Sequence, residues 1–152
     1  MLCRFITSRL GRYDQPCPDY LGSMRSGCVE DYQKHRMTIA ELHRLLSGYR
    51  IRFNSERELQ DGIERVLIGA ALSFERECRL SDRDRIDFLC NRVGIEVKIA
   101  SSYSQVLTQL FRYAQSPRLD SLLLITNKSR QLDMPKTILS KPVAVYFAGG
   151  YF

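Results

Sequence analysis

Residues 85–99 read Arg-Ile-Asp-Phe-Leu-Cys-Asn-Arg-Val-Gly-Ile-Glu-Val-Lys-Ile, and this stretch decides both the fold class and the candidate site. Apolar and polar side chains alternate through two short runs, Arg85–Cys90 and Gly94–Ile99. Such alternation is typical of β-strands with one face covered by the core. Asn91 and Arg92 separate the runs, and Asn is a favoured turn residue. The stretch therefore predicts two consecutive strands joined by a turn.

The two predicted strands bring acidic and basic side chains together. In the second strand Glu96 and Lys98 share one face, opposite the apolar residues Ile95, Val97 and Ile99. In the first strand Asp87 lies between Ile86 and Phe88, and a hairpin would place Asp87 beside Glu96. Two acids on a half-covered face cost free energy unless they are compensated. A divalent cation would compensate them, because hard cations bind carboxylate oxygens.

Further elements are predicted on both sides of this stretch. The predicted helices are Ile39–Ser47, a helix that follows the N-cap Ser55, Tyr103–Gln115, and a short helix near Pro135–Ser140. The other predicted strands are Ser73–Leu80, Leu122–Thr126 and Val143–Phe147. The order α-β-β-β-α-β-(α)-β predicts an α/β sandwich in which helices flank a mixed central sheet.

Length and composition limit the remaining classes. The 152 residues suit one domain, which we expect over residues 37–152, after an irregular N-terminal appendage over residues 1–36. Five scattered Cys without a C-x-x-C pair argue against a disulfide scaffold, and two His offer little for a zinc cluster. No apolar run approaches the roughly 20 residues that span a bilayer, and no signal peptide is recognised. We therefore expect a cytoplasmic protein in a reducing compartment.

The charge of the chain is distributed unevenly. The formal net charge is +6, which by itself fits either a polyanionic partner or a solvated basic surface. Residues 51–100 carry ten acids and nine bases, whereas residues 101–152 carry two acids and six bases. Lys98 is the only lysine between Lys34 and Lys128 in a chain that otherwise uses arginine. An isolated lysine beside two acids suggests a role other than surface charge, because ammonium and guanidinium are not interchangeable.

Asp87, eight intervening residues and Glu96-Val97-Lys98 resemble the signature of the PD-(D/E)xK nuclease superfamily, which includes restriction endonucleases, resolvases and repair nucleases. The resemblance runs from Ser55 to about Phe147 and takes in the segments Ser55–Gln60 and Gln109–Tyr113. It departs from the pattern at Ile86, where the family has its leading proline. The resemblance implies a restriction endonuclease-like fold and metal-dependent hydrolysis of phosphodiester bonds.

The resemblance also implies a set of site residues. The implied catalytic residues are Glu56, Asp87, Glu96, Lys98 and Gln109. Mg²⁺, for which Mn²⁺ would substitute, is expected on Asp87, Glu96 and the Val97 carbonyl, with Glu56 nearby. Lys98 would orient a water or stabilise the phosphoryl oxygens. Glu56 is preferred to Glu58 because it falls on the apolar face of the predicted helix, whereas Glu58 suits a solvated first turn. Gln109 is otherwise an ordinary polar helix position.

A nucleic acid is the expected partner, with phosphates bound by Arg76, Arg85, Arg112 and the basic C-terminal third. DNA is preferred to RNA only through the family, and a homodimer is a further expectation. Two alternatives stay open. One is a catalytically inactive nucleic-acid-binding or assembly module of the same fold. The other is an unrelated α/β interaction domain in which Asp87 and Lys98 merely pair.

Overall fold

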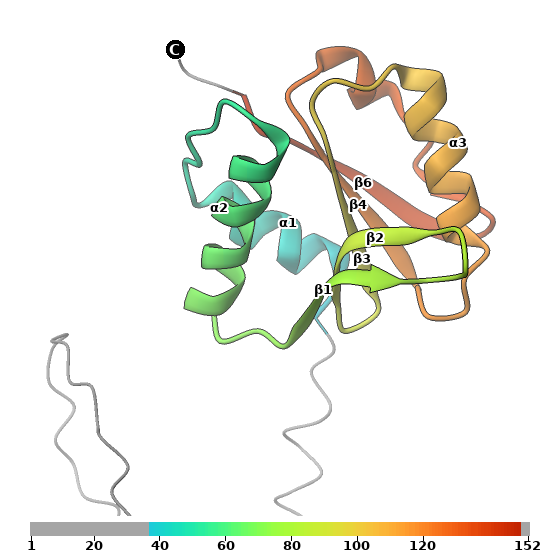
Figure 1. Cartoon of the computed structure of the whole chain (residues 1–152), viewed down its shortest axis with the longest axis horizontal. Helices are drawn as coiled ribbons and strands as arrows, with labels where there is room; N and C mark the ends of the chain where they lie inside the picture. The colour runs from blue at the N-terminus through green and yellow to red at the C-terminus, as the bar shows by residue number, and fades with distance from the viewer. Residues whose placement is uncertain (1–36, 150–152) are drawn as a thin grey trace, which may run out of the picture. The chain divides into compact units, whose positions relative to one another are not determined.

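A computed structural model describes residues 37–149, in which helices cover both faces of a six-stranded mixed sheet (Figure 1). The helices are α1 (Ile39–Ser47), α2 (Glu56–Gly69) and α3 (Tyr103–Ala114), with a short 3-10 helix, η1 (Ser129–Asp133). The strands are β1 (Phe74–Arg79), β2 (Arg85–Cys90), β3 (Val93–Lys98), β4 (Ser121–Thr126), β5 (Thr137–Ile138) and β6 (Lys141–Phe147). The predicted N-terminal appendage, residues 1–36, lies outside the described residues.

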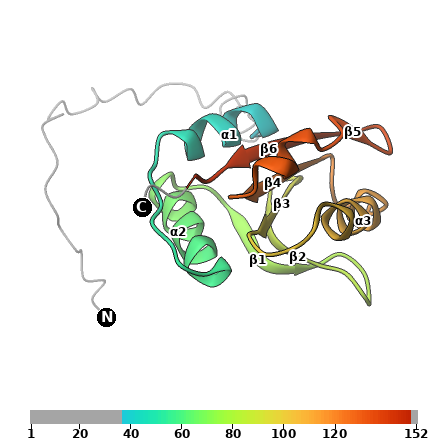
Figure 2. The same ribbon diagram turned by 90° about the horizontal axis from the view of Figure 1, so that it is seen from above.

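The sheet has the strand order β1-β2-β3-β4-β6-β5. Strands β3, β4 and β6 run parallel, while β1, β2 and β5 join by antiparallel hairpin pairing. Parallel neighbours need a crossover, and α3 supplies it between β3 and β4. Helices α1 and α2 cover one face of the sheet and α3 covers the other (Figure 2). The α/β class with a mixed, helix-flanked sheet is therefore confirmed.

Each helix begins at a side-chain cap that the sequence provides. The Thr38 hydroxyl accepts a hydrogen bond from the Glu41 backbone N–H, and the Glu41 carboxylate accepts one from the Thr38 backbone N–H. Ser55 caps α2 in the predicted way, and Ser102 and Gln105 form a second reciprocal capping box at α3. These caps provide hydrogen-bond partners for backbone N–H groups that have none within the helix. Each cap typically stabilises the folded protein by about 1 kcal/mol.

Two apolar clusters hold the layers together. The first lies between α1, α2 and the sheet and includes the fully buried Leu59, Ile95 and Val97. The second lies under α3 and includes Leu110 and Leu124. Full burial of such side chains contributes roughly 1.5–3 kcal/mol each. Strand β4 is buried along its whole length, as expected for a parallel strand covered on both faces.

The predicted short helix near Pro135–Ser140 is wrong. The helical turn lies earlier, over η1, and it ends at Met134 because the residue before a proline is pushed out of the helical region; Met134 has ψ 144°. Residues 137–138 instead form β5, which pairs with β6. Leu139 and Ser140 join them with φ of 48° and 66°, a two-residue turn that the sequence does not signal with Gly or Asn. The other predicted elements differ from the structure by one or two residues at their ends.

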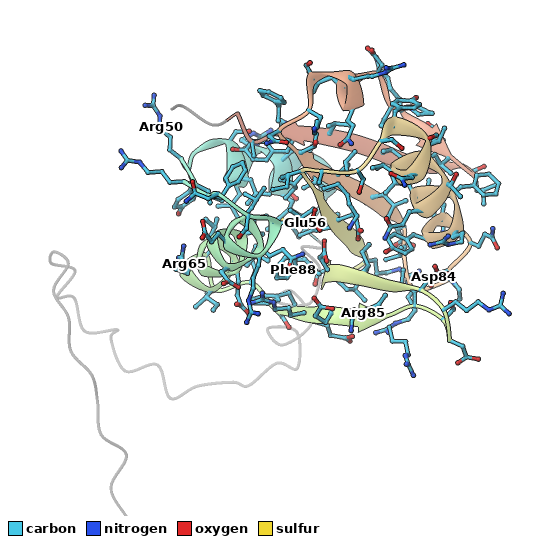
Figure 3. All side chains as sticks on the ribbon, turned by 45° about the horizontal axis from the view of Figure 1, so that its top comes forward. Arg50, Glu56, Arg65, Asp84, Arg85 and Phe88 are labelled. Carbon is cyan, nitrogen blue, oxygen red and sulfur yellow. The ribbon has the colours of Figure 1, made fainter. Side chains whose placement is uncertain are left out.

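The predicted alternation in β2 is also interrupted. Phe88 packs in the α1/α2 cluster, but Ile86 packs in the α3 cluster, so the two residues do not share a face. The change of face falls at Asp87, and Glu77 on the neighbouring strand β1 has φ 53°, in the left-handed region. Figure 3 shows Phe88 beside α2, and Arg85 further along the β1–β2 hairpin. This bend sets the direction of the Asp87 carboxylate.

Candidate active site

The candidate site forms where β2 and β3 separate. Their pairing runs from Cys90 and Val93 to Phe88 and Ile95, and the next opposed residues would be Asp87 and Glu96. Beyond that point the Asp87 carboxylate Oδ2 accepts a hydrogen bond from the Val97 backbone N–H at 2.7 Å. The N–H and C=O of one strand residue leave the strand at the same edge, so the Val97 carbonyl faces the same gap. The bend in β2 thus brings one carboxylate and one carbonyl together.

Glu96 is the most deeply buried acid of the site. It is 1% exposed, on the face of β3 that lies towards α3. Its Oε1 accepts a hydrogen bond from Gln109 Nε2 at 2.8 Å and lies 2.9 Å from Lys98 Nζ. Its Oε2 is buried and has no hydrogen-bond partner among the described residues. An unsatisfied buried carboxylate oxygen is costly, and in a native site it indicates a partner such as water or an ion.

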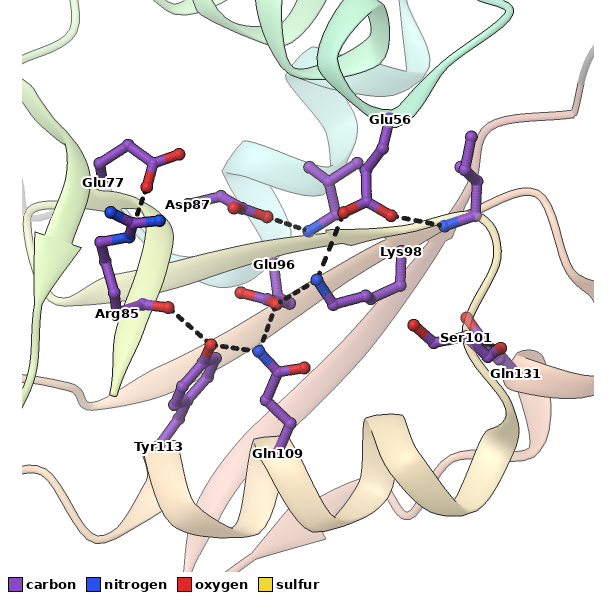
Figure 4. A network of polar contacts seen from close by, with 12 residues as sticks. Glu56, Glu77, Arg85, Asp87, Glu96, Lys98, Ser101, Gln109, Tyr113 and Gln131 are labelled. Carbon is purple, nitrogen blue, oxygen red and sulfur yellow. Dashed lines mark hydrogen bonds and ion pairs between the residues drawn. The ribbon is translucent and has the colours of Figure 1, made fainter. Parts of the chain in front are cut away.

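Lys98 links β3 to α2. Its ammonium lies 2.9 Å from Glu96 Oε1 and 3.3 Å from Glu56 Oε1, and its side chain is 16% exposed. Glu56 Oε2 also accepts a hydrogen bond from the Ile99 backbone N–H at 3.2 Å. Figure 4 shows Glu56 reaching from α2 to the end of β3. Glu58 instead is exposed and accepts from the Asn54 N–H at 2.7 Å, so of these two acids it is Glu56 that contacts the end of β3.

Helix α3 closes the network from the other side. Gln109 binds Glu96, and its Nε2 also contacts the Tyr113 hydroxyl one helical turn later. The Tyr113 hydroxyl donates to the Arg85 carbonyl oxygen at 2.6 Å, which fixes the tyrosine against β2 (Figure 4). Tyr113 is fully buried and was not among the predicted site residues, although its spacing from Gln109 gave a signal. Gln105, one turn earlier, does not join the network because it caps α3.

Burial and mutual repulsion set the protonation of the acids. Burial raises the pKa of Glu96 to about 8, and the nearby negative charge of Asp87 contributes. Burial also raises the pKa of Asp87 to about 6, against the hydrogen bond from Val97 and the charge of Lys98. Burial lowers the pKa of Lys98. The negative charges of Glu96, Glu56 and Asp87 raise this pKa by more than burial lowers it, so the net shift is upward. The site is thus short of positive charge even with Lys98 present.

The oxygen donors at this site that could hold a divalent cation such as Mg²⁺ are Asp87, Glu96 and the Val97 carbonyl. Within residues 37–149, no three His, Cys, Asp or Glu side chains are grouped closely enough to form a metal-binding cluster. Glu56 is directed to Lys98 and Ile99, so it does not complete such a cluster. Mg²⁺ commonly uses one or two carboxylates and keeps several waters, which matches Asp87, Glu96 and the Val97 carbonyl. The unsatisfied Glu96 Oε2 supplies a ligand atom that no protein group uses.

The three arginines predicted to bind phosphate are already paired with acids. Arg76 contacts Asp61 and Glu64 on α2. Arg85 pairs with Glu77 at 2.6 Å, and Arg112 pairs with Asp84 at 2.9 Å. A phosphate would have to displace or share these carboxylates. Most of these pairs are solvent-accessible, so each holds its arginine only weakly.

Two cysteines lie in the core of the sheet. Cys78 and Cys90 are buried free thiols in β1 and β2, and burial raises the pKa of Cys78 to about 11. Both act as small apolar side chains in the core.

No helix between residues 37 and 149 combines the length and apolar character needed to cross a membrane.

The fold and the site together define an α/β protein with a buried carboxylate–lysine network at the split of two strands. Comparisons of the chain with models of protein families, with curated protein sequences and with solved structures find no match. Any functional conclusion therefore depends on the geometry of this network.

Proposed function

We propose that the chain is a metal-dependent nuclease of the PD-(D/E)xK type that hydrolyses phosphodiester bonds. The observation that carries the proposal is the buried pair of Glu96 and Lys98, whose Glu96 Oε2 has no partner among residues 37–149, with the Asp87 carboxylate held next to it on the Val97 N–H. Burial raises the pKa of both Asp87 and Glu96, so it is unfavourable to place two ionised carboxylates here. An ion pair with a purely structural role would need only one of them.

The arrangement of elements supports the same proposal. Helix α2, the three strands β1 to β3, helix α3 and strand β4 follow one another in the order expected of a restriction endonuclease-like fold. The acids lie on the second and third strands, and Glu56, from the helix before the strands, contacts Lys98 and the Ile99 N–H at the end of the third strand. We infer that fold from this order together with the position of the acids.

The roles of the residues follow from their contacts. A bound Mg²⁺ would lower the pKa of a water and neutralise charge on the phosphoryl group. Asp87 is kept in place by the Val97 N–H, and Glu96 by Gln109 and Lys98. Lys98 has three N–H donors, and it can donate to a water or a phosphoryl oxygen while it keeps its acidic partners.

Two further residues position this machinery. Glu56 holds Lys98 from α2 and accepts from the Ile99 N–H, so it fixes the end of β3. Tyr113 holds Gln109 through its hydroxyl and is itself anchored on the Arg85 carbonyl. Both contacts restrict side chains that would otherwise rotate, which matters because a small displacement of a catalytic group lowers the rate steeply.

The expected substrate is DNA, supported by the basic C-terminal third and by the family resemblance. Residues 101–152 carry six bases and two acids. Phosphate contacts from such residues would make binding sensitive to salt. Nothing in the contacts of residues 37–149 distinguishes a DNA from an RNA backbone, so the choice of DNA comes from the resemblance.

A nucleic-acid-binding module without catalysis is the second candidate. Lys98 pairs with both Glu96 and Glu56, and these ion pairs neutralise part of the acidic charge without a cation. Such a module would bind DNA in a salt-dependent way but would give no product with Mg²⁺. The absence of cleavage thus separates the two candidates.

The test is cleavage of labelled linear, nicked, branched and supercoiled DNA by the full chain, with Mg²⁺ and with EDTA. We expect the wild type to cut at least one substrate with Mg²⁺ only, and Asp87→Asn to cut none. Glu58→Gln serves as the matched control, because Glu58 lies on the same helix as Glu56 but faces Asn54. Cleavage retained by Asp87→Asn would contradict the assignment. Binding without cleavage by the wild type would favour the inactive module.

A further inference from the structure

A pocket of about 440 Å³ lies where the chain leaves β3 and enters α3. Its walls include Ser101 and Ser104 at the start of α3, and Lys128, Arg130 and Gln131 after β4. The strands β3 and β4 are parallel, and both end at this pocket. In open α/β sheets, ligands bind outside the carboxyl ends of parallel strands, at the start of the helices that follow.

The electrostatics of the pocket favour an anion. Helix α3 has twelve residues and no acid in its first turn, so its positive dipole end is not neutralised locally. Lys128 and Arg130 are exposed, and neither forms an ion pair with any residue between 37 and 149. They differ in this from Arg76, Arg85 and Arg112, which all hold acids.

A second, independent observation concerns Gln131 in the pocket wall. Gln131 is 1% exposed, and its Nε2 donates to the Ser101 carbonyl at 3.0 Å. Its Oε1 is buried and has no hydrogen-bond partner within the described part of the chain. Because the Ser101 carbonyl fixes the amide orientation, Oε1 is left as an acceptor that needs a donor. A lining residue of the pocket thus carries an unused acceptor, which a ligand with a donor as well as a negative charge would satisfy.

We propose that this pocket is a nucleotide subsite that holds one unit of the substrate strand beside the reaction centre. The phosphate would lie at the start of α3 with Lys128 and Arg130, and a hydroxyl or N–H of the same nucleotide would donate to Gln131 Oε1. Ser101 follows Lys98 by three residues, so their Cα atoms are at most roughly 11 Å apart. Figure 4 shows Ser101 and Gln131 side by side on the Lys98 side of the network. The assignment to a substrate strand rests on the proposed nuclease function.

The test measures binding without chemistry, by calorimetry of the full chain in EDTA with thymidine 5′-monophosphate and with inorganic phosphate. The wild type is expected to bind the nucleotide several-fold more tightly than phosphate. Lys128→Gln with Arg130→Gln is expected to weaken nucleotide binding about tenfold or more, because two charge-assisted contacts are lost. The matched control is Arg52→Gln with Arg83→Gln, which removes the same charge at exposed positions outside the pocket and outside residues 101–152, and is expected to change affinity less than about twofold.

Gln131→Met tests the donor requirement, since it removes the acceptor at similar volume. It is expected to abolish the preference for nucleotide over phosphate, with folding checked by thermal unfolding. No nucleotide binding by the wild type at millimolar concentration would overturn the subsite. Equal affinity of the pocket and control double variants would overturn it as well. Nucleotide binding that depends on Lys128 and Arg130, in a chain that cuts no DNA with Mg²⁺, would support the pocket as a nucleotide site and contradict the nuclease.

Discussion

The two faces of β3 carry buried side chains with opposite consequences. Ile95 and Val97 face α1 and α2 and are fully enclosed in an apolar cluster. Glu96 faces α3 and is 1% exposed, while Lys98 is 16% exposed and pairs with both Glu96 and Glu56 of α2, so these residues form a polar network with an unsatisfied carboxylate oxygen. Burial of the first pair stabilises the fold, whereas burial of the second lowers stability and perturbs protonation. One six-residue strand thus combines a structural face with a face suited to chemistry.

The largest expected effect is a loss of cleavage rate when the polar face of β3 is changed. Lys98→Met keeps most of the apolar stem but removes the ammonium, and we expect cleavage of DNA with Mg²⁺ to fall by about a thousandfold. Arg83→Met, at an exposed position outside residues 101–152, is expected to leave the rate within about twofold. Initial rates at saturating substrate measure the difference. A Lys98→Met rate within tenfold of the wild type would remove Lys98 from the mechanism.

The apolar face is tested by Ile95→Ala. Truncation of a fully buried isoleucine leaves a cavity in the α1/α2 cluster and is expected to lower the free energy of unfolding by about 2–5 kcal/mol. Urea denaturation followed by circular dichroism gives this value. A loss below about 1 kcal/mol would mean that this face is not the structural one, contrary to the comparison.

The third prediction concerns the pH dependence of stability, which arises from the acids of the site and not from the apolar face of β3. Burial raises the pKa of Asp87 to about 6 and of Glu96 to about 8. Without metal, the folded state therefore binds more protons than the unfolded state between about pH 4 and pH 8, so stability falls as pH rises through this range. We expect Glu96→Gln to exceed the wild type in stability at pH 8 by on the order of 1–3 kcal/mol, with a smaller difference at pH 5.

Urea denaturation in EDTA at the two pH values provides the measurement. Mg²⁺ added at pH 8 is expected to raise the stability of the wild type, since it compensates the ionised acids, and to do so less for Glu96→Gln. If Glu96→Gln were less stable than the wild type at pH 8, the polar face would stabilise the fold without a cation, which would contradict this prediction.

The smallest expected effect concerns the two acids at the start of α2. Glu56→Gln weakens the hold on Lys98 and is expected to slow cleavage by about tenfold, because a positioning contact is lost. Glu58→Gln changes an exposed residue that binds Asn54, so we expect the rate to change less than about twofold. Parallel rate measurements at a temperature where both variants are folded decide the point. Equal rates would show that the orientation of Glu56 has no catalytic role.

Much of the fold could be predicted from the sequence because its signals are local. The N-cap Ser55 and regular apolar spacing predicted each main helix to within a residue or two. The side of α2 that Glu56 faces followed from helical periodicity in the same way. The residues that converge on Lys98 were predicted because their spacing resembles a known signature.

The missed features depend on contacts between distant segments. The change of face at Asp87 arises from the bend of the β1–β2 hairpin, and no local pattern announces it. The pairing of Arg76 with Asp61 and Glu64 joins β1 to α2 and needs the tertiary structure. The turn at Leu139 and Ser140 uses residues that rarely adopt positive φ. Tertiary packing overrides local preference in each case.

Binding of Mn²⁺, followed by electron paramagnetic resonance of the free ion, tests the carboxylate site most directly. Titration of the wild type at pH 7.5 is expected to show specific binding that is lost or strongly weakened in both Asp87→Asn and Glu96→Gln and kept in Glu58→Gln. The Glu58 variant controls for the loss of one surface acid. The same Mn²⁺ binding in all four proteins, or none in the wild type, would contradict a divalent-cation site on Asp87 and Glu96.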